Sequence, residues 1–280
     1  MALLKNLAKT VKFAGDVVVV EQCDNNEAEI RSVAKKLGLR LTYIYLEQAS
    51  MAHSTNVGVQ QAKTDLVLIL DDDVLGSTGF VQHHADNFSD PGIAATVGRC
   101  VTEGQTLQPD FTRTGRINWF GTVSDGFSST IRQEVDTVIG CNMCWRRSVY
   151  MELNGMDEKF TGNALRLDSD LSLRAKKNGY KIVFDPTAEI QHMRDPNGGA
   201  RKTEGRIQWY FHFFSNETYF FLKHFSPLLL PLFLLTKWQW AIRCIFGFGR
   251  EVSMRSLATP ISGIISGLQK YYNKGYDNRR

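Results

Sequence analysis

Residues 66–73 read Leu66-Val67-Leu68-Ile69-Leu70-Asp71-Asp72-Asp73, an apolar run followed at once by three carboxylates. The run has the length and composition of a β-strand buried on both faces, as in a parallel sheet covered by helices. Such sheets bind ligands beyond the carboxyl ends of their strands, which is where the acidic triplet lies. Side chains alternate along a strand, so Asp71 and Asp73 are expected on one side and Asp72 on the other.

Three adjacent carboxylates repel one another, and a bound divalent cation commonly relieves this repulsion. Hard cations such as Mg²⁺ and Mn²⁺ prefer carboxylate oxygens and often bridge to the phosphates of a nucleotide. The triplet therefore predicts a cation site at Asp71 and Asp73. The alternative is an acidic turn that only caps the next element.

The segments before the triplet alternate between strand and helix patterns. Residues 17–20 and 41–46 have the composition of strands, whereas residues 3–11 and 27–37 have helical spacing. Asn56 is expected to cap the helix that precedes the central strand. This order predicts an α/β fold with a doubly wound, mostly parallel sheet.

The segments after the triplet continue the alternation less regularly. Residues 80–88 are predicted to be helical and residues 93–101 to form a strand. Residues 105–130 are rich in Gly, Thr and Ser, which predicts a long loop or a hairpin over the active face. Residues 135–145 return to strand character, and residues 168–177 have a helical pattern.

Length and composition narrow the class of protein. A chain of 280 residues with 43% hydrophobic and 22% charged residues can hold one large α/β domain and an appendage. The net charge of +4 is too small to indicate a nucleic-acid partner. Five scattered cysteines suit a reducing compartment. Cys141 and Cys144 form one CxxC pair, but no second pair completes a structural zinc site.

The C-terminal part has a different composition. Aromatic residues crowd in from Ile207, and residues 227–235 are apolar but contain two prolines. A spanning helix needs about 20 apolar residues, so residues 207–248 are expected to contact a membrane surface as an interfacial or re-entrant segment. The alternative is a helical layer packed on the domain, or a dimer contact. We divide the chain into residues 1–203, the α/β domain, and residues 204–280, a helical extension.

Basic residues also gather late in the chain, among them Lys223, Lys237 and Arg243. Clustered basic residues favour an anionic membrane surface. No signal peptide is visible at the start of the sequence. We therefore expect a cytoplasmic protein that is peripheral on the inner face of the cell membrane.

Several short motifs follow one another in a fixed order: Val17–Glu21, Asn56–Ala62, Leu70–Val74, Gly140–Met143, Leu153–Phe160, Leu167–Arg174 and Ile190–His192. Each motif alone is weak, but in this order the chain resembles the family 2 glycosyltransferases from about Val17 to Arg201. The resemblance implies the GT-A fold. It also implies inverting transfer of a sugar from a UDP-, GDP- or dTDP-sugar to a hydroxyl of a glycan, a lipid-linked glycan or a polysaccharide.

The resemblance implies roles for the acidic residues. Asp71 and Asp73 would hold Mn²⁺ or Mg²⁺, which stabilises the charge that grows on the leaving diphosphate. His192 matches a histidine that completes the metal site in some relatives. Asp168 matches the base that takes the proton of the acceptor hydroxyl, at a helix start where the dipole favours a carboxylate. The alternative for Asp168 is a helix N-cap, and Asp170 competes for either role.

Other matched residues are candidates for donor binding. Glu21 matches an acid that contacts the base of the nucleotide, and Asn142 is expected to face the sugar. Asn56 and Asp72 are further candidates for contact with the donor. Residues 197–202, with the turn Asn197-Gly198-Gly199 and the basic pair Arg201-Lys202, are expected to form a mobile lid on the diphosphate.

The chain also departs from the pattern of the family. It lacks the family's first apolar strand before the helix at Leu3, so we expect the natural protein to begin upstream of Met1. Leu167 stands where the family commonly has an acid, and Glu21 replaces the commoner aspartate. The alternative function is therefore a truncated, non-catalytic remnant that binds a partner or a membrane. A nucleotidyltransferase would need a glycine-rich basic loop after the first strand, and none is visible.

Overall fold

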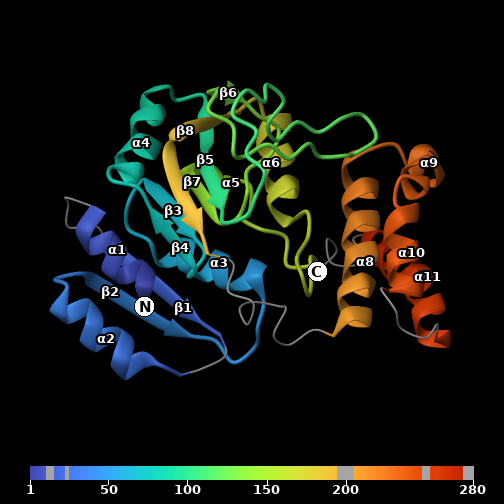
Figure 1. The fold of residues 1–280 in the computed structure, drawn as a ribbon, viewed down its shortest axis with the longest axis horizontal. Coiled ribbons are helices and arrows are strands. Elements are labelled where there is room, and N and C mark those ends of the chain that lie inside the picture. Colours follow the sequence, from blue (N-terminus) through green and yellow to red (C-terminus); the bar gives the residue numbers. More distant parts are fainter. Residues whose placement is uncertain (11–15, 23–24, 194–204, 248–252, 274–280) are drawn as a thin grey trace.

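The computed structural model describes residues 1–10, 16–22, 25–193, 205–247 and 253–273 (Figure 1). The helices are α1 Ala2–Thr10, α2 Glu27–Lys36, α3 Met51–Gln61, α4 Phe80–Asp86, α5 Arg147–Glu152, α6 Leu167–Lys177, α8 Arg206–His224, α9 Leu230–Leu235, α10 Trp238–Phe246 and α11 Met254–Tyr272. The strands are β1 Asp16–Glu21, β2 Arg40–Tyr45, β3 Leu66–Leu70, β4 Val74–Gly76, β5 Ile93–Thr102, β6 Gln133–Glu134, β7 Asn142–Arg146 and β8 Lys181–His192.

The strands form two sheets. The larger sheet has the order β3-β7-β5-β8-β4, and β6 pairs with β8. Within it β5 and β8 are parallel, whereas β7 runs antiparallel to both β3 and β5. The smaller sheet is the parallel pair of β1 and β2. The alternation of helices and strands is that of the predicted α/β class.

The acid-bearing strand β3 lies at an edge of its sheet. Among the described residues, β3 pairs with β7 alone, and β1 pairs with β2 alone. All five residues of β3 are partly exposed, so the prediction of a strand buried on both faces is wrong. The reason is that no strand covers its second edge. This separation of β1 from β3 agrees with the expected lack of the family's first strand.

Helix α3 begins six residues earlier than predicted. Ser50 is its N-cap, and its hydroxyl accepts a hydrogen bond from the backbone N–H of His53 at 3.2 Å. Asn56, the predicted cap, lies inside the helix. Ser and Asn are both good caps, and the sequence pattern alone did not distinguish them.

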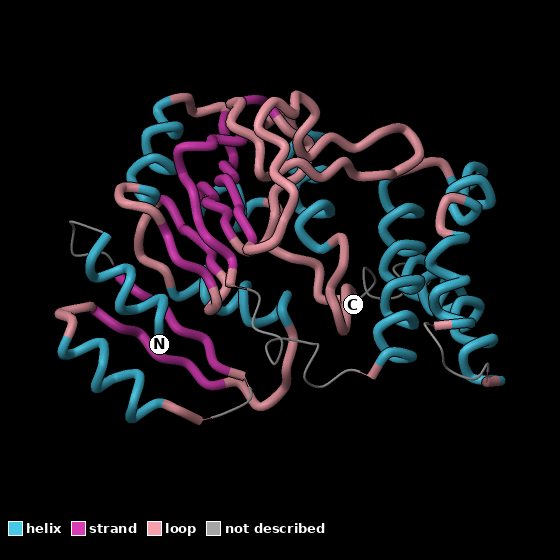
Figure 2. Tube along the Cα trace, viewed as in Figure 1, coloured by secondary structure: helices cyan, strands magenta, loops and turns pink. Residues whose placement is uncertain are grey.

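Helix α8 joins the C-terminal helices to the sheet. Its residues Tyr219 and Phe220 are buried in the main core, whereas Tyr210, Phe213 and Phe214 pack in a second cluster. Figure 2 shows α8 to α11 as a helical block at the end of the molecule away from β1 and β2. The prediction of a membrane surface from residue 207 onward is therefore corrected for α8, whose aromatic side chains are mostly internal. The predicted domain boundary at residue 203 lies outside the described residues.

Two of the basic residues in the C-terminal part of the chain, Lys237 and Lys223, form ion pairs inside the protein. Lys237 Nζ lies 3.1 Å from the buried Glu217, and Lys223 Nζ lies 2.6 Å from Asp157. Both lysine side chains are less than one-tenth exposed. The expectation that they face an anionic surface is wrong, because buried carboxylates hold them.

Candidate active site

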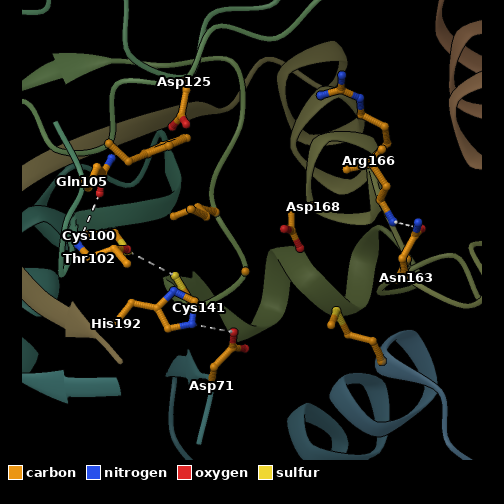
Figure 3. Close-up of a pocket in the computed structure, with 16 residues that line it drawn as sticks. Asp71, Cys100, Thr102, Gln105, Asp125, Cys141, Asn163, Arg166, Asp168 and His192 are labelled. Carbon is orange, nitrogen blue, oxygen red and sulfur yellow. Dashed lines mark hydrogen bonds and ion pairs between the residues drawn. The ribbon is translucent and has the colours of Figure 1, made fainter. Parts of the chain in front are cut away.

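A cavity of about 270 Å³ opens beside the carboxyl end of β3 (Figure 3). It is lined by Met51, Asp71, Cys100, Thr102, Gln105, Asp125, Phe127, Ile139, Gly140, Cys141, Asn163, Ala164, Leu165, Arg166, Asp168 and His192. They come from the start of α3, the segment after β3, β5, the long loop after β5, the loop before β7, the segment before α6 with its first turn, and the end of β8. That long loop was predicted, and it covers one wall of the cavity through Gln105, Asp125 and Phe127.

Strand pairing brings the acidic triplet to a histidine 119 positions later in the chain. Val74, which directly follows Asp73, pairs with His192 at the end of β8. His192 Nε2 consequently lies 3.0 Å from Asp73 Oδ1 and 3.9 Å from Asp71 Oδ2. One ligand atom from each of the three residues lies within 4.8 Å of the others. Asp72 is exposed and outside this group, as strand alternation predicts.

The electrostatics of this group are those of a cation site. Burial and the neighbouring carboxylates of Asp73 and Asp72 raise the pKa of Asp71 to about 6, although His192 opposes the shift. A hydrogen bond with Cys100 and the charge of Asp73 raise the pKa of His192, while burial acts against them. Carboxylate oxygens suit Mg²⁺ and Mn²⁺, and imidazole is a common additional ligand. The donor set therefore fits a divalent cation.

Asp168 lies on another wall of the cavity. It occupies the first turn of α6, whose N-cap is Arg166 with a φ of 73°, so the N-cap alternative for Asp168 is wrong. The backbone N–H of Gly140 donates to its carboxylate, while its buried Oδ1 has no hydrogen-bond partner. Burial and the nearby charge of Asp71 raise the pKa of Asp168 to about 7. A buried carboxyl with a partner-free oxygen at a cavity wall is suited to accept a proton.

Asp170, the competing acid, has a structural role in the protein. Its carboxylate lies 2.7 Å from Lys223 Nζ, 2.7 Å from His224 Nε2 and 2.9 Å from Arg174 Nε. Burial acts to raise the pKa of Asp170, but the hydrogen bond with His224 and these cations hold it well below its usual range. Asp170 does not line the cavity. Of the two acids that the sequence left open, only Asp168 lines the cavity, and its role as base stays a prediction.

Two asparagines predicted at the donor site lie elsewhere. Asn142 is fully buried, and its amide bonds to His84 and to the carbonyls of Arg99 and Ala188. The prediction that it faces the sugar is wrong, because its hydrogen-bonding capacity is used inside the core.

Asn56 likewise connects α3 to the segment after α5. Its side-chain oxygen accepts from the hydroxyl of Tyr150 at 2.7 Å and from the N–H of Met156 at 2.8 Å. Its side-chain nitrogen donates to the carbonyl of Met156 and to Glu158. Asn56 does not line the cavity, so its role in the structure is to hold these segments together.

Glu21 ends β1 and also does not line the cavity. Its carboxylate accepts hydrogen bonds from the hydroxyl of Tyr43 and from the backbone and side chain of Asn26. Burial acts to raise the pKa of Glu21, but these bonds outweigh it and lower the pKa. Contact of Glu21 with a nucleotide base stays a prediction. The predicted lid at residues 197–202 lies outside the described residues.

Gly140, Cys100 and Cys141 are among the cavity residues that were not predicted as site residues. Gly140 approaches Asp168 so closely that a Cβ at position 140 would lie 3.0 Å from Asp168 Oδ2. Cys100 and Cys141 lie beside His192, with their sulfurs 3.7 Å apart. Gly140 and Cys141 stand in a motif that the sequence did flag, whereas no local signal marks Cys100.

Comparison with known proteins gives relatives of low identity. Glucosyl-dolichyl phosphate glucuronosyltransferase from Haloferax volcanii is 23% identical over 196 residues, which are 66% of this chain and 61% of that protein. The chain thus spans about three-fifths of the length of this curated relative.

Solved structures share the fold. TarS residues 1–349 from S. aureus in complex with UDP-GlcNAc has a TM-score of 0.65 at 16% identity, covering 96% of this chain and 77% of that one. The mannosyltransferase PcManGT from Pyrobaculum calidifontis with GDP-Man and Mn²⁺ has a TM-score of 0.57 at 16% identity, covering 99% and 74%. GalNAc-T7 with UDP, GalNAc and Mn²⁺ has a TM-score of 0.59 at 15% identity, covering 78% and 46%. These likenesses confirm the predicted GT-A fold.

The family follows from the sequence match together with this fold. A profile described as "Glycosyltransferase like family 2" matches residues 2–210, which are 209 of the 280 residues. The ordered motifs, the acidic triplet at the end of β3 and the profile agree, and the chain belongs to the glycosyltransferase-like family 2.

Proposed function

We propose that this chain is an inverting glycosyltransferase that moves a sugar from a nucleotide-diphosphate donor to an acceptor hydroxyl. The main support for this proposal is the set of residues that line one cavity. A cation-binding set and a carboxylate with one partner-free oxygen face it from different elements, Asp71 and His192 on one side and Asp168 Oδ1 on another. Displacement of a leaving group by a hydroxyl on the opposite face needs these two functions, held apart.

The residues divide the chemistry between them. Asp71, Asp73 and His192 would hold Mn²⁺ or Mg²⁺, which supplies positive charge for the diphosphate of the leaving nucleotide when bound. Asp168 Oδ1 takes the proton of the acceptor hydroxyl as the new glycosidic bond forms. The N–H of Gly140 orients that carboxylate, and the loop wall of Gln105 and Phe127 limits access of water to it.

The relatives support a nucleotide-sugar donor and a divalent cation. TarS was solved with UDP-GlcNAc, and PcManGT with GDP-Man and Mn²⁺. We propose a UDP-, GDP- or dTDP-sugar as the donor of this chain. The name of the Haloferax relative contains a dolichyl phosphate, which favours a lipid-linked or other glycan acceptor.

A donor screen tests this function. Each nucleotide sugar is incubated with the protein, Mn²⁺ and a mixture of lipid-linked and free glycan acceptors, and released nucleotide diphosphate is measured. We expect release with one donor class, dependent on acceptor, and lost in Asp168→Asn. Release that is unchanged in Asp168→Asn would refute the assigned base, and no release with any donor favours the second candidate below.

The second candidate is a non-catalytic binding protein. The observation in its favour is that, in the described part of the chain, no ladder joins β1 to β3, so the smaller sheet is separate from the strand that carries the acids. Calorimetry of UDP, GDP and dTDP in Mn²⁺ separates the candidates. Binding of a nucleotide supports the enzyme, whereas the remnant binds none of them.

We also propose that α9 to α11 rest on the inner face of a membrane. In the described residues no single helix could cross a bilayer by length and composition, and Pro227–Leu235 with Trp238–Phe246 meet that test only as a pair bent by 53°. Exposed apolar side chains repeat at helical spacing along residues 228–246 and along α11. They are Leu228, Leu232, Leu235, Trp238, Ile242, Phe246, Leu257, Ile261 and Ile265. Such stripes suit shallow insertion among lipid headgroups.

Flotation with phosphatidylcholine and phosphatidylglycerol vesicles tests the membrane contact. Trp238 is 57% exposed on α10, and Trp119 is 64% exposed in the long loop, so the two residues form a matched pair. We expect Trp238→Ser, combined with Leu235→Ser, to reduce vesicle binding several-fold, and Trp119→Ser to leave it unchanged. Equal binding of all variants would exclude this surface.

A further inference from the structure

A pair of cysteines lies directly beside the proposed cation site. Cys100 lies in β5, and Cys141 immediately precedes β7. The two cysteines are 41 positions apart in sequence. Both are buried, neither forms a disulfide, and both line the cavity (Figure 3). Cys100 also forms a hydrogen bond with His192. The base mechanism and the carboxylate site use neither sulfur.

The spacing of this pair is that of two ligands on one metal ion. The Sγ atoms are 3.7 Å apart. Tetrahedral Zn²⁺ with Zn–S bonds of about 2.3 Å places two sulfurs about 3.8 Å apart. A disulfide would need about 2.05 Å. One ligand atom from each of Cys100, Cys141 and His192 lies within 4.8 Å of the others.

We propose that Cys100, Cys141 and His192 form a second metal site, which takes a thiophilic cation of the Zn²⁺ class. The set is three protein ligands with a fourth position open to the cavity, an arrangement that Zn²⁺ accepts. Two thiolates and a neutral imidazole balance the charge of Zn²⁺. Each thiol gives its proton to solvent as the metal binds, so no other reactant is needed.

The site shares His192 with the carboxylate set. Asp71, Asp73 and His192 suit a hard cation, whereas Cys100, Cys141 and His192 suit a soft one. Zn²⁺ on the sulfurs would occupy the imidazole that the carboxylate site uses, in the same cavity that Asp71 and Asp168 line. Zn²⁺ therefore acts as an inhibitor of the Mn²⁺-dependent reaction. This consequence rests on the proposed function, but the metal site does not.

Cobalt absorption tests the site without any turnover. Co²⁺ bound by thiolates gives strong sulfur-to-cobalt absorption in the near ultraviolet, and carboxylate and imidazole ligands give none. We expect the reduced full chain to show this band with Co²⁺, and Zn²⁺ to remove it by displacement. Cys100→Ser and Cys141→Ser should each weaken the band, and the double variant should lose it. Zn²⁺ affinity should fall at least about 100-fold in each single variant, since even outer-shell partners contribute about 10–100-fold.

Cys144 is the matched control, because it forms the CxxC pair with Cys141 and is also buried and free. It pairs in the sheet with Leu68 and Thr96 and does not line the cavity. Cys144→Ala should keep the full band. A wild-type chain without the band in excess Co²⁺ would overturn the proposal, even if no variant folds. A band that survives in a folded double variant, or that Cys144→Ala removes, would do so as well.

Inhibition is measured separately. Zn²⁺ should lower the Mn²⁺-supported rate of the wild type, and the Cys100→Ala, Cys141→Ala variant should resist it at least about tenfold, each relative to its own rate without Zn²⁺. Equal sensitivity of the two proteins would show that any inhibition arises elsewhere. If no sugar transfer is found, the cobalt spectra still decide the metal site, so the two failures are distinguishable.

Discussion

Replacement of Asp168 by asparagine should abolish transfer and yet stabilise the protein at alkaline pH. The folded chain raises the pKa of this carboxyl from 3.8 to about 7. An acid with a raised folded pKa stabilises the fold at low pH and loses that contribution as pH rises through the folded value. Relative to a side chain that does not titrate, Asp168 therefore lowers the free energy of unfolding by about 4 kcal/mol at pH 8 and about 2 kcal/mol at pH 5, at 1.36 kcal/mol per pKa unit.

The amide introduced by Asp168→Asn cannot ionise, so the stability of this variant relative to wild type should rise by about 2–3 kcal/mol between pH 5 and pH 8. Any fixed cost of the amide cancels in this difference. The assay is urea unfolding at both pH values in protein freed of cations with EDTA. A difference within about 0.5 kcal/mol across this range, which is the ordinary scale of a surface substitution, would refute the electrostatic reasoning.

Asp170→Asn provides the control two residues away. Its carboxylate is paired with Arg174, Lys223 and His224, and its pKa lies below the usual range. An acid with a lowered folded pKa keeps its stabilising contribution above its unfolded pKa and loses it only as pH falls through the folded value. Asp170→Asn should therefore lose about 3–5 kcal/mol at both pH 5 and pH 8, because it breaks a buried ion pair.

Three further predictions concern activity. Asp73→Ala should reduce the steady-state kcat/KM of Mn²⁺-dependent transfer by at least about 100-fold, because charge stabilisation of the transition state is lost. A smaller loss would argue against a cation at Asp73. Gly140→Ala should lower kcat by about 10- to 100-fold while nucleotide affinity stays the same, because its Cβ would lie 3.0 Å from Asp168 Oδ2. The kcat/KM of the wild type should rise with pH to a plateau, because Asp168 must be ionised to accept a proton and its pKa is about 7; a profile that falls over this range would contradict the role of base.

The sequence predicted well those features that local patterns determine. The apolar run before Asp71 is a strand, alternation places Asp72 outward, and residues 105–130 form a loop at the cavity. The ordered motifs named the fold correctly, although each was weak alone. These successes depend on side-chain periodicity and on the place of a strand end in a sheet, which are local properties.

Features that depend on partners far apart in the chain were not predictable. Nothing local shows that Asp170 meets Lys223 and His224, or that Asn142 meets His84 in the core. The register of β8 beside β4 decides that His192 reaches Asp73. Burial of strand β3 was mispredicted for the same reason, because exposure of a strand depends on whether another strand pairs with its edge.

The assignment of the cation to the acidic triplet is tested by calorimetric titration of nucleotide diphosphate into wild type, Asp73→Ala and Asp168→Asn, each in the presence and absence of Mn²⁺. We predict that wild type and Asp168→Asn bind the nucleotide with similar affinity in Mn²⁺ and at least about tenfold more weakly without it. Asp73→Ala should bind equally weakly in both conditions. Full Mn²⁺-dependent binding by Asp73→Ala would contradict the assignment of the cation to the acidic triplet, and with it the proposed division of roles in the cavity.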